Sequence, residues 1–401
     1  MTRKFQPLKQ CLCCSSTNLS LALDLGQQPL ANSYLSDKNS VEYSYPLKLN
    51  YCNNCTHLQL SCSVNPDLLF KNYLYVSGTT QTLRDYFDSL VSVVQTYVPY
   101  RENASILEIA CNDGTQLDSF KKAGYATYGI DPAENLYPLS SKNHDIVCDY
   151  FDQPSIEKLS IKEFDVILAE NVFAHVNYPQ TFAQYAKSLL KPGGKIFIQT
   201  SQANMVSLGQ FDTVYHEHIS FFNIRSMVKL LEKVGLYLED VQKPSIHGTS
   251  YLFVISSNPN DDHSQKLIEL ESSQTPLTIE KFRTNALESV NDLRSKIEEY
   301  RLKNIPIIGY GAAAKGNTLL NFGRLDLDYI VDDNPLKHNL YTPGRRIPIV
   351  SLDTINKKFK DKPVAWIPLS WNFFKEIKEK INHNRKEQQD FFIQIKFSNL
   401  K

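Results

Sequence analysis

The sequence predicts an α/β protein in three parts: a cysteine-rich N-terminal segment, a central doubly wound sheet and a smaller C-terminal α/β unit. Three observations support this prediction. Five of the eight cysteines lie in two tight clusters near the N-terminus. Strand and helix patterns alternate between residues 105 and 256. The alternation restarts at residue 305, after a polar stretch and a long amphipathic helix.

Length and charge limit the classes of function. A chain of 401 residues is expected to form two or three domains, and a hydrophobic fraction of 42% is enough for packed cores. Lys+Arg and Asp+Glu are equal at 43 each, so no basic field attracts nucleic acid. The sequence has no run of 18 apolar residues and no apolar signal-peptide core. We expect a soluble cytoplasmic monomer without a nucleic-acid or membrane partner.

The N-terminal cysteines form two Cys-x2-Cys pairs, Cys11 with Cys14 and Cys52 with Cys55. Four thiolates in two such pairs suit the tetrahedral geometry of a structural Zn²⁺ site. Cys13 and His57 are alternative ligands. Two other interpretations are a chance group of free thiols and a zinc ribbon that binds nucleic acid, and the neutral charge argues against the ribbon.

The central region alternates helices and strands. Helical spacing begins near Thr80, and its apolar face is Leu83, Phe87, Leu90, Val94 and Val98. The predicted strands are residues 105–110, 126–130, 145–148, 164–169, 195–199, 236–241 and 250–256. One helix is predicted directly after Asp113. A second spans residues 180–190 and stops at Pro192-Gly193-Gly194, and a third spans residues 227–234 and ends at Gly235. Seven strands with intervening helices predict a doubly wound sheet.

The C-terminal region follows a polar stretch, residues 257–264, which we interpret as a linker. A long amphipathic helix is predicted for residues 279–302. A strand at 305–308, a Gly-Tyr-Gly turn and a helix then predict a second, smaller α/β unit.

The first polar loop of the central sheet follows the strand at 105–110. Its candidate ligand-binding residues are Glu108, Ala110, Asn112, Asp113 and Gly114. Such loops lie at the carboxyl ends of strands, where α/β sheets bind ligands. Few glycines are left to cradle a pyrophosphate, which argues against NAD. A sulfonium nucleoside has no phosphate, so the loop favours S-adenosylmethionine (SAM).

The next two strands end in residues that suit the rest of this cofactor. Asp131 can accept hydrogen bonds from both ribose hydroxyls. Asp149 provides an acid for an exocyclic amine, and Phe151 an aromatic ring for the purine face. The alternative is a set of surface carboxylates that cap helices.

Histidines gather after the later strands of the central sheet. The run Tyr215-His216-Glu217-His218 follows the fifth strand, His175 the fourth, and His247 lies between the last two. Histidine titrates near neutral pH and suits a general base. Alternatives are structural histidines or a metal site. In an extended segment, His216 and His218 would share one side and Tyr215 and Glu217 the other.

The C-terminal unit contains Gly309-Tyr310-Gly311 followed by a helix that starts near Lys315. Backbone N–H groups, the helix dipole and the lysine suit a phosphate or diphosphate. The candidate substrate-binding residues here are Gly309, Gly311, Lys315, Asn317, Asp332 and Asp333. The two aspartates end the next strand, where a nucleotide-binding unit places an acid near a ribose. The alternative is a tight structural turn.

These motifs resemble the three-domain sugar C-methyltransferases, which act on nucleotide-linked 4-keto-deoxysugars in bacterial antibiotic and polysaccharide pathways. The resemblance covers essentially the whole chain and rests on the Cys pairs and on LEIACNDGTQL, GIDPAENL, YHEHISFF, GYGAAAKGNTLLN and VDDNP. It implies a zinc-binding domain at 1–70, a class I (Rossmann-like, seven-stranded) methyltransferase domain at 71–258, and a Rossmann-like domain at 259–401 that helps hold a sugar nucleotide such as a dTDP-sugar.

The resemblance also implies roles for single residues. His218 is similar to the family's base, with Tyr215 and Glu217 beside it, and His175 matches another active-site histidine. Tyr73 or Tyr75 falls where the family has a tyrosine near the sugar. The family reads His-Gly-Gly-Ser-Leu-Arg from His247 onward, and the arginine is absent here. Ala110 replaces the usual first glycine of the cofactor loop.

The function predicted from the sequence is SAM-dependent methylation at C3 of a 4-keto sugar through an enolate. The alternatives are an O- or N-methyltransferase on a nucleotide sugar, an NAD-dependent oxidoreductase that uses the C-terminal glycine turn, and a zinc-ribbon scaffold without enzymatic activity.

Overall fold

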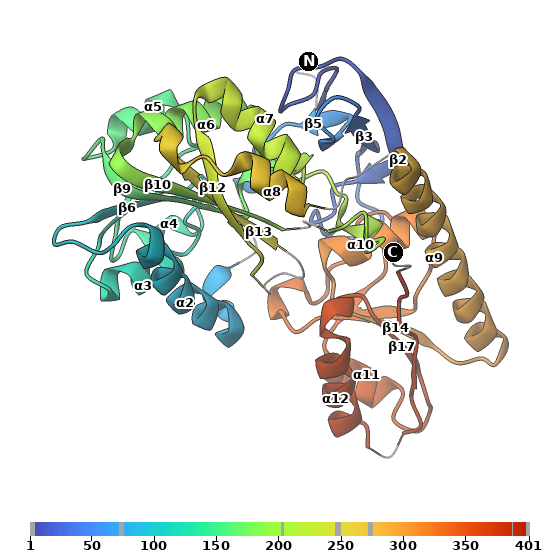
Figure 1. Cartoon of the computed structure of the whole chain (residues 1–401). Coiled ribbons are helices and arrows are strands. Elements are labelled where there is room, and N and C mark those ends of the chain that lie inside the picture. The colour runs from blue at the N-terminus through green and yellow to red at the C-terminus, as the bar shows by residue number, and fades with distance from the viewer. Residues whose placement is uncertain are drawn as a thin grey trace.

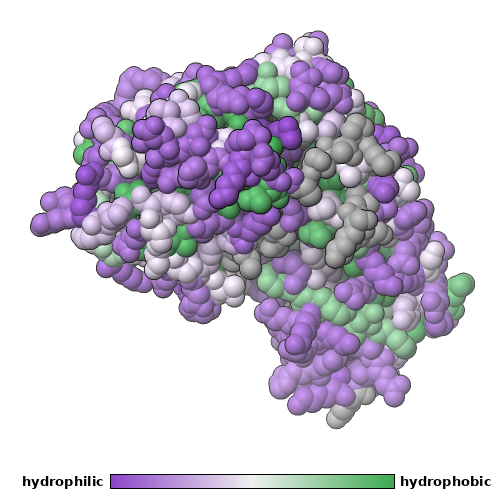
Figure 2. Space-filling model, in the orientation of Figure 1, coloured by the Kyte–Doolittle hydropathy of each residue, from purple (hydrophilic) through white to green (hydrophobic). Residues whose placement is uncertain are grey.

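The computed structural model describes residues 5–71, 76–201, 204–244, 250–271, 276–386 and 388–397. It has the three predicted parts, coloured in Figure 1 from blue at the N-terminus, through cyan, green and yellow, to orange and red at the C-terminus. Figure 2 shows a largely hydrophilic face whose outline is notched between the central and the C-terminal parts. Among the helices of the described ranges, none is long and apolar enough to cross a membrane.

The central sheet has seven strands in the order β12-β13-β10-β9-β6-β7-β8. Their bounds are β6 Ser105–Ile109, β7 Ala126–Ile130, β8 Asp145–Val147, β9 Phe164–Glu170, β10 Leu190–Ser201, β12 Tyr237–Gln242 and β13 Ser250–Ser256. Strand β13 runs in the opposite direction to both strands it pairs with, β10 and β12. Strands such as β6 are buried along their whole length, because helices cover both faces of a parallel sheet. The predicted doubly wound sheet is confirmed.

The helices of this part are α2 Gln81–Tyr97, α3 Thr115–Lys122, α4 Tyr137–Ser140, α5 Gln153–Lys158, α6 Pro179–Ser188, α7 Ile224–Val234 and α8 Ser264–Leu270. Local sequence sets the ends of α7. Asn223 and Ser226 form a capping box at its start, and Gly235 ends it in the left-handed region.

Two predicted segments differ from the structure. Helix α6 ends at Ser188, and the predicted helix stop at residues 192–194 lies inside β10. Gly193 has φ +78°, and the pairing of β10 with β9 shifts register between Leu190 and Lys195, so this turn is an irregularity within a strand. The predicted linker at 257–264 also differs, because it contains a 3-10 turn, Pro259–Asp261, and the first residue of α8.

The C-terminal part begins with the long helix α9 (Pro276–Leu302). Its parallel sheet has the order β16-β15-β14-β17-β18. The strands are β14 Ile307–Tyr310, β15 Tyr329–Val331, β16 Ile349–Val350, β17 Ala365–Pro368 and β18 Phe391–Phe392. The helices are α10 Ala314–Gly323, α11 Leu352–Lys358 and α12 Phe374–Asn384. This is the smaller α/β unit that the sequence predicts.

The N-terminal part is a sheet completed from the middle of the chain. Its order is β11-β4-β3-β2. The bounds are β2 Leu19–Pro29, β3 Ser44–Cys52, β4 Leu58–Leu60 and β11 Ser220–Phe221; beside them lie β1 Phe5–Pro7, β5 Cys62–Val64 and α1 Asp67–Phe70. In β11, Ser220 pairs with Gln59. The residues directly after His218 are therefore held by the N-terminal sheet, a pairing the sequence analysis does not predict.

One hydrophobic core joins the N-terminal and C-terminal parts. It contains Leu49 of the N-terminal sheet, Phe282 of α9 and Ile367 of the C-terminal sheet, all fully buried. Helix α9 lies along β2 (Figure 1), and Nε of Arg283 donates to the carbonyl oxygen of Ala22 at 3.1 Å. The N-terminal and C-terminal parts of the chain therefore share one hydrophobic core.

Candidate active site

The four predicted zinc ligands converge at the base of the N-terminal sheet. The sulfur atoms of Cys11, Cys14, Cys52 and Cys55 all lie within 4.8 Å of one another. The distances from Sγ of Cys11 to Sγ of Cys55, and from Sγ of Cys14 to Sγ of Cys52, are both 3.5 Å. Tetrahedral zinc with Zn–S bonds of about 2.3 Å needs S–S separations of about 3.8 Å, so the set fits the ion. The cluster does not include the alternative ligands Cys13 and His57, and Nε2 of His57 instead lies 3.2 Å from Oγ of Ser220 in β11.

The predicted cofactor loop is held in a tight left-handed turn. Ala110 has φ +64°, Asn112 φ +52° and Gly114 φ +81°. The backbone N–H of Asn112 donates to Oδ2 of Asp131 at 2.8 Å, and that of Ala133 donates to Oδ1 of Asp131 at 2.8 Å. The loop and Asp131 therefore form one unit at the carboxyl ends of β6 and β7.

A short 3-10 turn, Ser77–Thr79, covers this loop. The backbone N–H of Ser77 donates to Oδ1 of Asn112, and that of Gly78 donates to Oδ2 of Asp113, both at 2.9 Å. A Cβ at Gly78 would lie 2.3 Å from Oγ1 of Thr115, so only glycine allows this close approach. The side chains of Asn112 and Asp113 therefore anchor the covering turn.

Carboxyl groups line the inner side of the cofactor loop. With its amide oriented to satisfy both acids, Gln116 donates to Oε2 of Glu170 at 3.0 Å and to Oε1 of Glu108 at 3.2 Å. The hydroxyl of Tyr86 donates to Oε1 of Glu170 at 3.3 Å. Burial raises the pKa of Glu170 to about 8, and burial together with neighbouring acids raises the pKa of Glu108 well above its usual value. A cationic ligand would stabilise the ionised forms of both.

The two residues predicted for the adenine lie beyond β8. Oδ2 of Asp149 accepts from Nζ of Lys158 at 2.7 Å, and this hydrogen bond holds the pKa of Asp149 below its usual value. The ring of Phe151 packs edge-on against Phe182 of α6, with 4.8 Å between the ring centroids. Asp149 therefore remains ionised, while Phe151 belongs partly to the core. Their roles toward the purine stay predictions.

The segment Tyr215-His216-Glu217-His218 forms a turn. The backbone N–H of His218 donates to the carbonyl oxygen of Tyr215 at 2.9 Å, which brings their side chains together. The hydroxyl of Tyr215 lies 2.9 Å from Nε2 of His218. The expectation of an extended segment, with these side chains on opposite sides, is wrong because this i to i+3 hydrogen bond reverses the chain.

The other two members of the run face different neighbours. Oε1 of Glu217 accepts from Nδ2 of Asn32 at 2.7 Å, and burial raises the pKa of Glu217 to about 7. His216 packs edge-on against Tyr45 of β3, 5.8 Å between centroids. Burial lowers the pKa of His216 to about 4, opposed by hydrogen bonds with the backbone of Pro46 and Tyr45 in β3. His216 therefore faces the N-terminal sheet, away from His218.

Aromatic rings from two parts of the chain stack on the predicted base. His175 lies parallel to His218 with 5.2 Å between centroids, and Phe70 of α1 stacks on the other face of His175 at 5.3 Å. The carbonyl oxygen of Thr213 lies 3.1 Å from Nδ1 of His218. Because that oxygen can only accept, neutral His218 carries its proton on Nδ1 and presents its lone pair on Nε2.

The C-terminal loop repeats the backbone pattern of the cofactor loop. Gly311 has φ +94°, and the N–H of Ala312 donates to Oδ2 of Asp332 at 2.7 Å. Nζ of Lys337 donates to the carbonyl oxygen of Ala312 at 2.8 Å and lies 3.4 Å from Oδ2 of Asp332. The hydroxyl of Tyr34 donates to the same carbonyl oxygen at 2.5 Å. Asp332 therefore has a cation and an N-terminal residue beside it.

The remaining predicted residues of this loop separate into inner and outer positions. Nδ2 of Asn317 donates to the carbonyl oxygen of Ala31 at 2.7 Å, so Asn317 faces the N-terminal part. Asp333 points outward and pairs with Nζ of Lys380 at 2.7 Å. Gly309 is packed by three side chains, each 3.0 Å from where its Cβ would be, in the centre of β14. Tyr73, Tyr75 and His247 lie outside the described residues.

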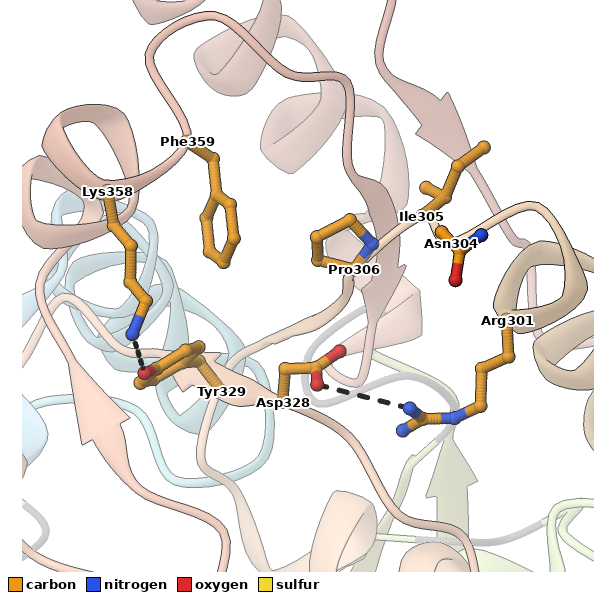
Figure 3. A pocket seen from close by; sticks show the side chains of 8 residues that line it. All are labelled: Arg301, Asn304, Ile305, Pro306, Asp328, Tyr329, Lys358 and Phe359. Carbon is orange, nitrogen blue, oxygen red and sulfur yellow. Dashed lines mark hydrogen bonds and ion pairs between the residues drawn. The ribbon is translucent and has the colours of Figure 1, made fainter.

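A cavity of about 410 Å³ lies at the opposite edge of the C-terminal sheet (Figure 3). It is lined by Arg301, Asn304, Ile305, Pro306, Asp328, Tyr329, Lys358 and Phe359. None of the predicted site residues lines it. Because parallel sheets bind ligands at the carboxyl ends of their strands, this cavity is not part of the candidate site.

Sequence reasoning missed several polar residues that complete the site. They are Asn32, Tyr34, Tyr86, Gln116, Glu170, Gln199, Asp212, Lys337 and Trp371. Glu170 had a usable signal, because it directly follows the predicted strand at 164–169. Gln116, Gln199, Asp212 and Lys337 also had one, because each lies at a strand end or within five residues of a predicted site residue. Asn32, Tyr34, Tyr86 and Trp371 carry no local signal, since each reaches the site from a distant part of the chain.

Three family models match consecutive parts of the chain. A zinc binding domain matches residues 11–70, a methyltransferase domain residues 82–241, and a C-methyltransferase C-terminal domain residues 245–395. Together with the seven-stranded sheet and the four-cysteine cluster, they define an S-adenosylmethionine-dependent methyltransferase with a zinc-binding N-terminal part.

The relatives narrow the class. C-methyltransferase NovU of Streptomyces niveus is 26% identical over 389 residues, which cover 93% of this chain and 92% of that protein. The human mitochondrial ubiquinone biosynthesis O-methyltransferase is 27% identical but spans only 38% of this chain and 47% of its own. The PH0226 protein of Pyrococcus horikoshii OT3 covers 49% of this chain and 97% of its own, with 18% identity and a TM-score of 0.37. Together with the three domain matches, the similarity to NovU over almost the whole of both chains identifies this chain as an S-adenosylmethionine-dependent C-methyltransferase.

Proposed function

We propose that this C-methyltransferase acts at C3 of a nucleotide-linked 4-keto-deoxysugar through an enolate. The observation that carries the proposal is the pair formed by Tyr215 and His218, whose hydroxyl and Nε2 lie 2.9 Å apart. A C-methylation needs a carbanion, and a keto group acidifies the neighbouring C–H bond. The motifs that resemble the sugar C-methyltransferases support a sugar nucleotide as the acceptor.

His218 is suited to act as the base. Burial, then the charges of His175 and Lys315, lower the pKa of His218 well below its usual value, so the ring is neutral near pH 7. Nε2 accepts the C3 proton, the C–H electron pair forms the C3–C4 double bond, and the 4-keto oxygen takes the negative charge. The hydroxyl of Tyr215, beside Nε2, orients the sugar or donates to that oxygen.

The cofactor side is suited to a cation. SAM, when bound, supplies an electrophilic methyl group on a positively charged sulfur. Glu108 and Glu170 would hold the sulfonium charge and the ammonium group of SAM, and Asp131 would hold its ribose. The backbone N–H of Gly78 donates to Asp113, so the turn at 77–79 would cover the bound cofactor. Such an arrangement would hold the two reactants together, which lowers the entropic part of the barrier.

The experiment is hydrogen exchange at C3. We expect the enzyme to exchange the C3 hydrogen of dTDP-4-keto-6-deoxyglucose with D₂O when S-adenosylhomocysteine fills the cofactor site. His218→Ala should lower exchange and methylation by about 10²–10⁴-fold, as loss of a general base does, with SAM affinity unchanged. Tyr215→Phe should slow the reaction less, because one hydrogen bond is removed and the base remains.

His263→Ala is the matched control, since His263 is exposed on the methyltransferase surface and should leave the rate unchanged. Methylation by His218→Ala at the wild-type rate would exclude His218 as the base. Product NMR with the new methyl group on oxygen or nitrogen would exclude the enolate.

A further inference from the structure

Lys315 is placed where the C-terminal loop meets the segment that leads into residues 215–218. It is the second residue of α10, and its Nζ lies over the ring of Trp371, 5.1 Å from the centroid. Nε1 of Trp371 donates to Oδ2 of Asp212 at 2.6 Å. Asp212 lies three residues before Tyr215 and has no exposed surface. The three side chains form a cluster between the two α/β units.

The cluster is a buried charged site. Burial raises the pKa of Asp212 to about 6, opposed by the charge of Lys315, and burial lowers the pKa of Lys315, opposed by the charge of Asp212. Hydrogen bonds from Trp371 and from the backbone of Asp212 and Thr213 also oppose the effect of burial on Asp212. Removing opposite charges from water is costly, so both charged groups depend on these partners.

The same lysine is coupled to the base. Its positive charge is one of the causes that lower the pKa of His218. Helix α10 also touches the segment between Asp212 and Tyr215, since Oγ1 of Thr318 donates to the carbonyl oxygen of Val214 at 3.3 Å. Lys315 therefore lies beside the segment that leads into Tyr215 and His218.

We propose that Lys315 is a catalytic residue whose ammonium stabilises the oxyanion formed next to the carbon that His218 deprotonates, and that Asp212 and Trp371 are the residues that position this ammonium. This inference rests on the proposed function. The C–H bond breaks, its proton goes to Nε2 of His218, its electron pair forms the C–C double bond, and the carbonyl π pair moves to oxygen. A preorganised cation in a buried site stabilises that charge far more than water does.

The sequence pattern alone predicts a different role for Lys315, namely binding the diphosphate of the sugar nucleotide. The two roles separate in kinetics. A phosphate ligand contributes to binding of substrate and nucleotide alike, whereas an oxyanion stabiliser acts in the transition state only.

The experiment measures C3 exchange by Lys315→Met at saturating dTDP-4-keto-6-deoxyglucose, with S-adenosylhomocysteine present. We expect exchange to fall about 10²–10³-fold, while calorimetry shows the affinity for dTDP and for the sugar nucleotide changed less than about threefold. Lys315→Arg should restore part of the rate. Exchange at the wild-type rate, or loss of dTDP affinity without loss of saturated rate, would overturn the role of Lys315.

Failure of the proposed function gives another result, since wild-type enzyme itself would then show no exchange. Asp212→Asn and Trp371→Phe should lower kcat with KM unchanged and should add little to Lys315→Met, because all three act through one ammonium. Full additivity would contradict the positioning role. Lys358→Met is the control: Lys358 bonds the hydroxyl of Tyr329 at the opposite edge of the same sheet (Figure 3).

Discussion

The methyltransferase unit and the C-terminal unit share the same backbone turn after their first strand, but the charges around the two turns are opposite. In each, the residue at the tip of the first strand has positive φ, and its N–H donates at 2.7 Å to a carbonyl oxygen of the next strand: Ala110 to Ile130 and Gly311 to Val331. In each, an aspartate at the end of that second strand accepts two backbone N–H groups.

The side chains around these aspartates differ. Burial and the neighbouring acid Asp113 raise the pKa of Asp131, and the buried acids Glu108 of β6 and Glu170 of β9 lie nearby. Asp332 is paired with Lys337, and Lys315 starts the following helix. The first loop suits a cationic ligand and the second an anionic one. The turns at Ala110 and Gly311 determine where a ligand can approach the backbone, and the side chains around each turn determine which ligand charge is favoured.

Loss of zinc should test whether the two loops depend equally on the N-terminal part. Cys52→Ser should lower zinc content from about one ion per chain to near zero, because binding a structural Zn²⁺ contributes on the order of 10 kcal/mol to folding. The pairing of β11 with β4 and the hydrogen bond from Asn32 to Glu217 should then be lost, so residues 215–218 are no longer held in place. We expect activity and sugar-nucleotide binding to be lost while SAM binding persists. Metal analysis and calorimetry measure both. Cys62→Ser is the control, since Cys62 lies outside the cluster, and equal loss of SAM binding would contradict the distinction.

Exchanging the residues at the two loop tips should sharpen the comparison. Gly311→Ala places a Cβ 2.4 Å from Oγ of Ser370 at φ +94°, so we expect a loss of about 1–3 kcal/mol in the free energy of unfolding and weaker sugar-nucleotide binding. Ala110→Gly should cost less than about 1 kcal/mol, because Ala110 already tolerates φ +64°. Denaturant titration measures both changes. Equal losses would contradict the expected steric conflict between a Cβ at position 311 and Ser370.

The paired aspartates should separate the two ligands. Asp131→Ala should weaken SAM binding by about 1–3 kcal/mol, the range for leaving buried polar partners unpaired, and should leave dTDP binding unchanged. Asp332→Ala should do the reverse. Calorimetry on both variants with both ligands completes the test. A loss of SAM affinity in Asp332→Ala would mean that the loops are coupled.

The acidic environment of the first loop should appear as a pH dependence. The pKa of Glu170 is raised to about 8, so free enzyme at pH 7 holds that proton, and binding a cation should release it. SAM affinity should therefore rise with pH, by up to about tenfold per unit, and level off above about pH 8. Glu170→Gln should flatten the curve, and dTDP affinity should follow no such trend. A flat wild-type curve would show that Glu170 is not linked to the cofactor.

The elements that sequence predicts well are those with strong local signals. The strand at 126–130 is found at its stated bounds, because a short segment with β-prone residues lies between Gly124 and the polar Asp131. The four zinc ligands are found together because Cys-x2-Cys spacing is itself the geometry of a metal knuckle. The turn at Gly311 follows from glycine's freedom at positive φ.

The sequence does not predict contacts that involve very short elements or residues far apart along the chain. β11 has two residues and pairs with β4 more than 150 residues earlier, so no periodicity marks it. Asn32 meets Glu217 across 185 residues. The turn from Tyr215 to His218 contains no glycine or proline that would mark it in the sequence. The roles of the site residues and the boundaries 1–70, 71–258 and 259–401 stay predictions.

The pairing of β11 with β4 also bears on how the chain folds during synthesis. Cys55, the last zinc ligand, leaves the ribosome long before Phe221, which completes the N-terminal sheet. At about 5–20 residues per second, this interval lasts roughly 8–33 seconds. Throughout it the metal site can form while one edge of its sheet is open, and α9, which covers β2, is made later still. The first part to be synthesised is thus among the last to be finished, and its open edge is the point at which a chaperone would protect the nascent enzyme.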